Sequence, residues 1–359
     1  MKKLSVLLVV TAFLGLSSLA MADSITPSTF TGSGPTGASY TVHKTVTISA
    51  GTPTTAQGDI LFLSDTTGSM GGVITAVKTN ASAILTNLSG LGNMQFGSGE
   101  YKDFPTSPWG GASDYPYKLN SAIGTAANAQ TGITAWSATG GNDTPESNLH
   151  ALQQAAGSGT GWRDGSKKFV LWFGDAPGHD PTGSPSTVGY PGPTEATATA
   201  TLTSAGITVL GFNAGNLDAY GQATRITAAT LGSLTTLGST DPDAVSDAII
   251  AAIGESFLTY TSVSLDTSEV PAGVGVTVSL PYIGEYDRSI DRIFEFDVTF
   301  TDLEPGTHTF NIYALVDGGR VATEGDTINS AIPEPATMLL LGSGLIGLAG
   351  YGRKKFFKK

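Results

Sequence analysis

One carboxylate and two hydroxyls follow the short apolar run 60–63, where Asp65, Thr67 and Ser69 occupy alternate positions. A short apolar run bounded by glycine-containing turns predicts a buried strand. The three side chains should therefore lie on a loop at the end of that strand. Oxygen ligands of this kind suit one hard divalent cation, above all Mg²⁺, with Mn²⁺ and Ca²⁺ as alternatives. Because no serine or cysteine nucleophile with its base accompanies them, the pattern predicts a binding site and not an enzyme.

A second group of oxygen-bearing side chains, Asp143-Thr144-Pro145-Glu146, stands before a stretch whose apolar spacing predicts a helix over 146–156. Its oxygens could also reach a cation at the end of a neighbouring strand. The alternative is that Asp143 or Thr144 only caps the helix, with Pro145 in its first turn. Capping and coordination use different residues, so both roles can hold together.

A third carboxylate, Asp175, follows the apolar run 169–173. This run predicts another buried strand, so Asp175 should stand at a strand end as Asp65 does. In doubly wound α/β sheets, ligands bind outside the carboxyl ends of the strands. A plain turn residue is the alternative role for Asp175.

Strand-like and helix-like patterns alternate over residues 58–257, which predicts an α/β domain with a doubly wound, mostly parallel sheet. The expected strands are 60–64, 96–101, 168–173 and 207–212. The expected helices are 73–88, 117–130, 146–156, 194–205, 222–230 and 241–253.

Residues 258–331 contain five segments of alternating polarity separated by Pro, Gly and Asp turns, which predicts a smaller antiparallel β-sandwich. Residues 23–57 are rich in Ser, Thr, Pro and Gly and should form a loose segment, apart from one strand at 40–50. We expect that strand to pair into the sandwich. The α/β domain would then be inserted between strands of the sandwich.

The Asp65-x-Thr67-x-Ser69 pattern on such a chain resembles the von Willebrand factor A domain and its metal-ion-dependent adhesion site. The family pattern is Asp-x-Ser-x-Ser, so Thr67 is a departure that keeps the hydroxyl. Asp175 stands where the family has its third-loop aspartate. The resemblance implies that these residues share one cation, with an open position that grips an acidic residue of a protein ligand.

The segment 143–146 resembles the Asp-Ser-Pro-Glu segment of the integrin β I-like domain, which implies that Glu146 completes the metal shell. Thr144 would be the second-loop ligand if the site follows the simpler A domains. Two departures imply a single cation. Met70 is followed by two glycines where integrins carry a neighbouring acidic site, and Gly141 stands where a flanking ligand would be expected.

Both ends of the chain carry targeting patterns. Residues 1–22 read as a cleaved export signal, with two lysines, an apolar core and a small-x-small site. Residues 332–359 hold Pro-Glu-Pro, a short apolar segment over 336–352 and a basic cluster. This tail resembles the PEP-CTERM sorting signal of Gram-negative bacteria. The resemblance implies export across the inner membrane, transient membrane contact through the tail, recognition by an exosortase, and placement at the cell surface or in the extracellular matrix.

Composition narrows the class of partner. The net charge of −12 disfavours nucleic acid as a ligand, and an exported chain without cysteine must rest on buried cores. We therefore expect a cation-dependent adhesion or protein-binding protein, whose partner is a protein offering an acidic residue or a protein associated with matrix polysaccharide. One alternative is a structural matrix protein without a functional metal site. Another is a metal-dependent hydrolase that uses His150 or His179.

Overall fold

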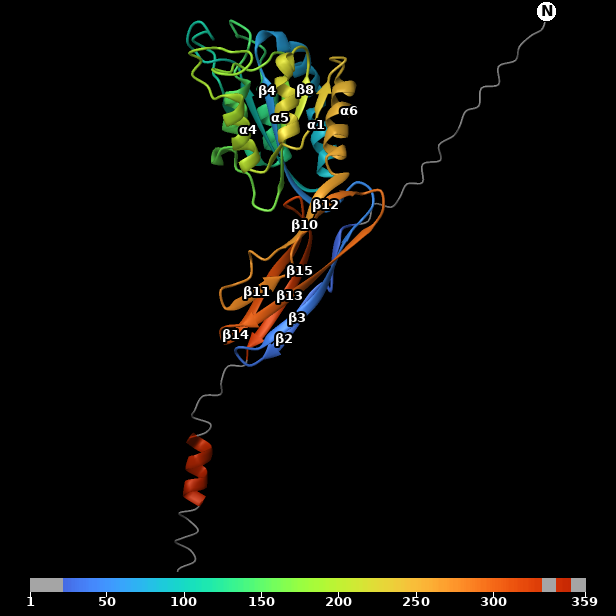
Figure 1. Cartoon of the computed structure of the whole chain (residues 1–359), viewed down its shortest axis with the longest axis vertical. Coiled ribbons are helices and arrows are strands. Elements are labelled where there is room, and N and C mark those ends of the chain that lie inside the picture. The colour runs from blue at the N-terminus through green and yellow to red at the C-terminus, as the bar shows by residue number, and fades with distance from the viewer. Residues whose placement is uncertain (1–21, 331–339, 350–359) are drawn as a thin grey trace, which may run out of the picture.

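The computed structural model describes residues 22–330 and 340–349 (Figure 1). An α/β domain occupies one end of the molecule and a β-sandwich lies beyond it. The fold class predicted from the sequence is confirmed.

The sheet of the α/β domain has six strands in the order β6-β5-β4-β7-β8-β9. All neighbouring strands are parallel except β5 and β6, which are antiparallel. The strand order reverses between β4 and β7, and such a switch point is where open α/β sheets bind their ligands. The strands are β4 (Ala56–Asp65), β5 (Gly92–Tyr101), β6 (Lys118–Gly124), β7 (Lys167–Gly174), β8 (Ile207–Asn213) and β9 (Leu234–Thr236).

Helices cover both faces of this sheet. In β4, Ile60 and Phe62 pack in one core with α1 and α6, whereas Leu61 and Leu63 pack in the other with α3, α4 and α5. This two-sided burial explains why β4 is a continuous apolar run instead of an alternating one. The helices are α1 (Gly71–Ser89), α2 (Ala126–Thr134), α3 (Asn148–Ala155), α4 (Glu195–Ser204), α5 (Gln222–Ala229) and α6 (Pro242–Glu255), with 3-10 turns η1 (Gly68–Met70), η2 (Ser158–Thr160) and η3 (Ala219–Gly221).

The helix predicted over 117–130 is wrong in its first half. That half is the antiparallel edge strand β6, and α2 starts only at Ala126. The residues of β6 are half-buried or exposed, so they lack the apolar run that marks the inner strands. The three-residue strand β9 was not expected, because it is too short to show a pattern.

The sandwich consists of two sheets, with strand orders β1-β3-β13-β11 and β12-β10-β14-β15-β2. Its strands are β1 (Ser24–Thr26), β2 (Thr29–Gly34), β3 (Ser39–Ile48), β10 (Thr259–Asp266), β11 (Val274–Val278), β12 (Tyr282–Asp287), β13 (Arg292–Asp302), β14 (Gly306–Val316) and β15 (Gly319–Ser330).

Strands from both sides of the α/β domain build this sandwich. β3 pairs with β13 from Ser39↔Thr301 to Ile48↔Arg292. Residues 23–39, expected to be loose, contain two further strands: β1 pairs with β3, and β2 pairs in parallel with β15. The Ser, Thr and Gly residues of β1 and β2 do not show the alternating polarity typical of strands. These segments form strands because their backbones pair with β3 and β15.

No helix within 22–330 or 340–349 is long and apolar enough to cross a membrane. Residues 340–349 are helical and belong to the apolar segment expected at 336–352. The remainder of that segment lies outside the described residues, as do residues 1–21 of the export signal.

Candidate metal centre

Asp65 ends β4 at the switch point and is fully buried. Its Oδ1 accepts hydrogen bonds from the Thr67 amide at 2.7 Å and from the Thr67 hydroxyl at 2.8 Å. These bonds use the hydroxyl hydrogen of Thr67 and leave oxygen lone pairs for a cation. The exposed Ser69 places its Oγ 3.4 Å from Thr67 Oγ1, near the ~3 Å that separates adjacent ligands of an octahedral Mg²⁺.

The loop that carries Glu146 packs directly on the Asp65 loop. Gly68 donates its amide hydrogen to the Gly140 carbonyl at 3.1 Å. Gly141 has a left-handed φ of +78°, and a Cβ there would lie 2.9 Å from Thr67 Cγ2 and 3.7 Å from Glu146 Oε1. Glycine is therefore required at this position, and the side chains of Thr67 and Glu146 flank it.

Backbone pairing fixes Glu146 between two strand ends. Its amide donates to the Pro177 carbonyl at 3.0 Å, and its carbonyl accepts from the His179 amide at 2.9 Å. The next amide, of Ser147, donates to the Lys102 carbonyl at 3.0 Å. Because these two residues pair with neighbouring loops, α3 begins at Asn148 and not at Glu146 as expected.

Asp175 follows β7 and is half-buried. A Cβ on the preceding Gly174 would lie 3.9 Å from Asp65 Cβ, so the two strand ends are adjacent. The charge of Asp175 contributes to raising the pKa values of Asp65 and Glu146, after the larger effect of burial. The structure thus brings together Asp65, Thr67, Ser69 and Glu146, with Asp175 beside them. Thr144, the alternative second-loop ligand, is exposed, whereas Glu146 is buried.

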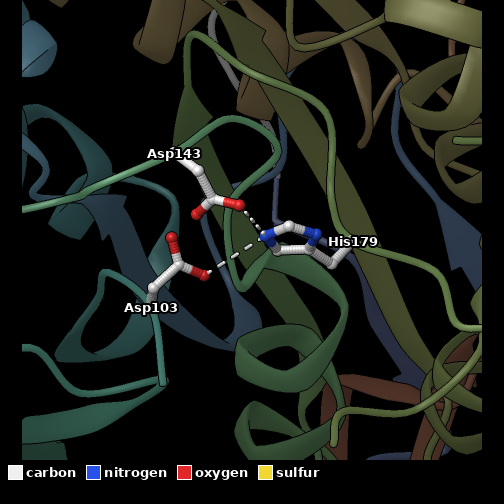
Figure 2. A group of neighbouring side chains, drawn as sticks. All are labelled: Asp103, Asp143 and His179. Carbon is white, nitrogen blue, oxygen red and sulfur yellow. Dashed lines mark ion pairs between the residues drawn. The ribbon is translucent and has the colours of Figure 1, made fainter. Parts of the chain in front are cut away.

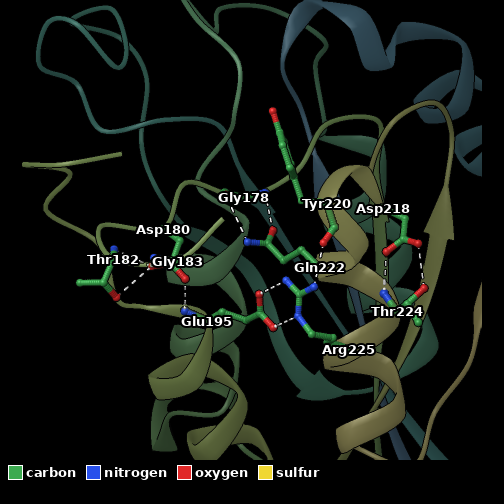
Figure 3. Close-up of polar contacts among 10 residues, drawn as sticks. All are labelled: Gly178, Asp180, Thr182, Gly183, Glu195, Asp218, Tyr220, Gln222, Thr224 and Arg225. Carbon is green, nitrogen blue, oxygen red and sulfur yellow. Dashed lines mark hydrogen bonds and ion pairs between the residues drawn. The ribbon is translucent and has the colours of Figure 1, made fainter. Parts of the chain in front are cut away.

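Polar contacts from α5 hold the third loop in place (Figure 3). The buried Gln222 side chain accepts from the Gly178 amide at 2.6 Å and donates to the Gly178 carbonyl at 3.1 Å. Arg225 makes two hydrogen bonds of 2.7 Å to Glu195 at the start of α4. The loop from Asp175 to α4 is therefore tied to two helices.

The residues present fit a hard divalent cation. Burial raises the pKa values of Asp65 and Glu146 above their usual range, and the negative charge of Asp65 raises the pKa of Glu146 further. Asp65 Oδ2 and Glu146 Oε2 are buried, and neither has a hydrogen-bond partner among residues 22–330 and 340–349. A cation would stabilise both ionised carboxylates, and the ligand set contains oxygen alone.

Lys102 was not expected at this site. Its ammonium donates hydrogen bonds to the carbonyls of Thr66 and Thr139, and to that of Ser137 at 3.2 Å. Lys102 therefore holds the first and second loops together, because its ammonium hydrogens bind backbone carbonyls of both.

A second group lies next to the first and consists of Asp103, Asp143 and His179 (Figure 2). His179 Nε2 lies 3.7 Å from Asp103 Oδ1 and 3.6 Å from Asp143 Oδ2. One potential ligand atom from each residue lies within 4.8 Å of the others. In the described part of the chain, His179 Nε2, Asp103 Oδ2 and Asp143 Oδ1 are buried without a hydrogen-bond partner. These three side chains could hold an ion.

Burial shifts the pKa values of all three side chains in this second group. Burial lowers the pKa of His179 to about 4, so its imidazole is neutral at pH 7, as a ligand must be. Burial raises the pKa of Asp103 to about 7 and that of Asp143 to about 6, so a cation there would compete with protons near neutral pH. Asp103 also interacts with Glu146, which links the two groups. Sequence reasoning weighed His179 only for hydrolysis, since its distance in sequence from Asp103 hides their proximity.

The C-terminal end carries a recognised signal. Residues 331–354 match the PEP-CTERM protein-sorting motif. This match confirms the resemblance seen over 332–359. The search of curated proteins found no match to the chain.

Several solved structures are similar to the chain. One is a von Willebrand factor type A protein from Catenulispora acidiphila, with 14% sequence identity and a TM-score of 0.43. The match covers 89% of this chain and 76% of that one. Another is the pilus adhesin SpaC from Lactobacillus rhamnosus GG in its open conformation: 15% identity, TM-score 0.38, 81% of this chain and 45% of that one. A third is proximal thread matrix protein 1 from the mussel byssus: 15% identity, TM-score 0.40, 60% of this chain and 50% of that one.

The chain therefore spans half or less of the length of the pilus adhesin and of the byssus protein. The assignment of the α/β fold rests on the strand order of the chain itself.

Proposed function

We propose that this chain is an exported adhesion or protein-binding protein of the bacterial cell surface or extracellular matrix, which binds its partner through one divalent cation, Mg²⁺ by preference. The observation that carries the proposal is the convergence of three loops at the switch point of the sheet. There Asp65 Oδ2 and Glu146 Oε2 are both buried without a hydrogen-bond partner in the described residues. The sorting motif at 331–354 supports export and processing by an exosortase.

Each residue has a distinct part in this proposal. The hydroxyls of Thr67 and Ser69 bind the cation, and Asp65 orients Thr67 through its two hydrogen bonds. Glu146 and Asp175 supply negative charge from the second and third loops. When bound, the cation would offer a coordination position to a carboxylate of the partner. The exposure of Ser69 marks the side from which that partner approaches.

The neighbouring group of Asp103, Asp143 and His179 favours a second cation beside the first. Its contacts of 3.6 and 3.7 Å are long for hydrogen bonds but suit ligands of a shared ion. Because the set includes an imidazole nitrogen, we propose Zn²⁺ or Mn²⁺ in preference to Mg²⁺. This second ion would hold the Glu146 loop through Asp103.

Capture of partners from extracellular matrix extracts tests the adhesion proposal. The wild-type chain should retain a partner in Mg²⁺ and release it on chelation, and Asp65→Asn should retain none. Asp297→Asn is the matched control, because it removes the same charge from an exposed position in the sandwich. Capture that is unaffected by both chelator and Asp65→Asn would contradict the proposal and favour a structural matrix protein.

Assays of substrate turnover distinguish the adhesion proposal from the alternative of a metal-dependent hydrolase. Panels of ester, peptide and glycan substrates should yield no product with the wild-type chain. Activity that is lost in Asp65→Asn and kept in Asp297→Asn would replace the adhesion proposal with a metal-dependent hydrolase.

A further inference from the structure

A lysine and two carboxylic acids lie inside the β-sandwich, away from the metal centre. Lys44 is on β3 in one sheet, and Glu324 and Asp326 are on β15 in the other. Their side chains have no solvent exposure. The inward positions around Lys44 on β3 are Val42, Val46 and Ile48, so an ionisable group interrupts an apolar row. Buried lysines are rare unless they are paired.

The three groups are in contact. Lys44 Nζ donates a hydrogen bond to Asp326 Oδ2 at 3.0 Å and also contacts Glu324 Oε1. The ring of Phe300 lies 5.7 Å from the ammonium. Glu324 Oε2 and Asp326 Oδ1 are buried, and within 22–330 and 340–349 they have no hydrogen-bond partner. One cation thus faces two carboxyl groups in an apolar surrounding.

A salt bridge alone explains this arrangement poorly. One ammonium can neutralise only one of the two carboxylates, so a full negative charge would remain buried if both ionised. Burial raises the pKa of Glu324 to about 7 and that of Asp326 above its usual range, so a proton is held within the trio. An amine and a neutral carboxylic acid in contact, shielded from water, are the reactants of an amide bond.

We propose that Lys44 and Asp326 condense to form an intramolecular amide cross-link between the two sheets, with Glu324 transferring protons. The 3.0 Å hydrogen bond from Lys44 Nζ to Asp326 Oδ2 holds the nitrogen next to the carboxyl group whose carbon, Cγ, it must attack.

The step balances within the three residues. A proton passes from the Lys44 ammonium to the Asp326 carboxylate, which leaves a free amine and a neutral acid. The nitrogen lone pair then forms the Nζ–Cγ bond. Protonated Glu324 gives its proton to the departing hydroxyl as the Cγ–O bond breaks, and it takes up the second proton from nitrogen. One water molecule leaves, Glu324 returns to its initial state, and no oxidant or other reactant is needed.

Two physical effects favour the amide. It replaces a buried ammonium and a buried carboxylate with a neutral group, which removes their desolvation cost. The interior also shields the product from the water needed for hydrolysis, because none of the three side chains reaches solvent.

The location gives the cross-link a mechanical consequence that does not depend on the metal proposal. The linked residues are 282 positions apart and enclose the entire α/β domain in a covalent loop. At its start, β15 contacts the α/β domain through a 2.8 Å hydrogen bond from the Arg320 amide to the Gly165 carbonyl. At its end, it leads into the sorting motif at 331–354. A pull on the C-terminus would therefore reach β3 through a covalent bond instead of peeling β15 from the sandwich.

Peptide mass mapping of the exported, folded chain tests this inference. We expect the peptide containing Lys44 joined to the peptide containing Asp326, lighter than their sum by one water molecule. Lys118 and Glu100 form the internal control, because their 2.8 Å ion pair is of similar length but Lys118 is half-exposed. Those two peptides should appear separately.

The Glu324→Gln variant tests the role of the proton carrier. It keeps both reacting groups, and we expect the Lys44 and Asp326 peptides to be separate and at full mass. The wild-type map decides the matter even if this variant fails to fold. Separate, full-mass peptides from folded wild-type chain would overturn the cross-link, and a link from Lys44 to Glu324 would overturn the assignment of Asp326.

Discussion

The backbone of Glu146 forms a parallel bridge opposite Gly178, in which the His179 amide donates to the Glu146 carbonyl at 2.9 Å. This single bridge joins the loop before α3 to the loop after β7. It places the buried carboxylate of Glu146 near Asp65 on one side and the His179 group on the other. The chain itself therefore links the loops that carry the two candidate ion sites.

Gly141→Ala should abolish high-affinity Mg²⁺ binding while the protein stays folded. The new Cβ would meet Thr67 Cγ2 at 2.9 Å, on a backbone with a φ of +78°. We expect a stability loss of about 1–2 kcal/mol from the left-handed conformation, plus displacement of Thr67. Isothermal titration calorimetry and urea unfolding measure the two effects.

Gly206→Ala is the matched control for that variant, because Gly206 has a φ of +65° and nothing within 4 Å of its Cβ position. It should cost similar stability and leave Mg²⁺ affinity unchanged. Equal affinity losses in the two variants would show that the effect comes from general destabilisation and not from the site.

Gln222→Ala should weaken cation binding from a distance. It removes both hydrogen bonds to the buried backbone of Gly178, and an unsatisfied buried group costs about 1–3 kcal/mol. Arg225→Ala, on the same helix, breaks a half-exposed ion pair worth only ~1 kcal/mol or less. Thermal unfolding with and without Mg²⁺ should show a reduced metal-dependent gain for Gln222→Ala only.

Acid should have opposite effects on the chelated and the cation-loaded protein. Burial raises the pKa of Asp65 to about 7, so in chelator this group stabilises the fold at low pH and loses that contribution as pH rises from about 4 through 7. A bound cation needs the ionised carboxylates, so its stabilisation grows over the same range. The difference in unfolding free energy between Mg²⁺ and chelator should therefore widen from about pH 5 to about pH 8. If the difference in unfolding free energy between Mg²⁺ and chelator does not change with pH, this prediction is contradicted.

The number of Mn²⁺ ions bound per chain tests the second candidate site, formed by Asp103, Asp143 and His179. The wild-type chain equilibrated with Mn²⁺ should retain two ions after desalting, and His179→Ala should retain one. Asp65→Asn should retain the ion at the His179 group. Plasma mass spectrometry measures the ratio, and equal content in wild type and His179→Ala would refute a second cation.

The sequence was most informative where burial is strongest. Both faces of β4 and β7 are covered, so each strand contains an unbroken apolar run. The carboxylate that follows each run, Asp65 or Asp175, could therefore be predicted to stand at a strand end. The opposite holds for β1, β2 and β6, where small and polar residues form strands because a partner strand is present.

The remainder of the candidate site depends on tertiary contacts. Lys102 was passed over because its role lies in binding three backbone carbonyls of other loops. His179 joins Asp103 and Asp143 only through the backbone bridge at Glu146. Alternation along β3 places Lys44 on the inward face, but its partners on β15 lie far along the chain and no local pattern identifies them. No local pattern carries such information.

The most direct test of the central claim is an anomalous difference map from crystals of the chain soaked in Mn²⁺. We predict a peak within bonding distance of the hydroxyl oxygens of Thr67 and Ser69, beside the carboxylate of Glu146, and its absence in crystals of Asp65→Asn. A map in which the wild-type chain shows no Mn²⁺ at these oxygens would contradict cation-dependent binding at this site.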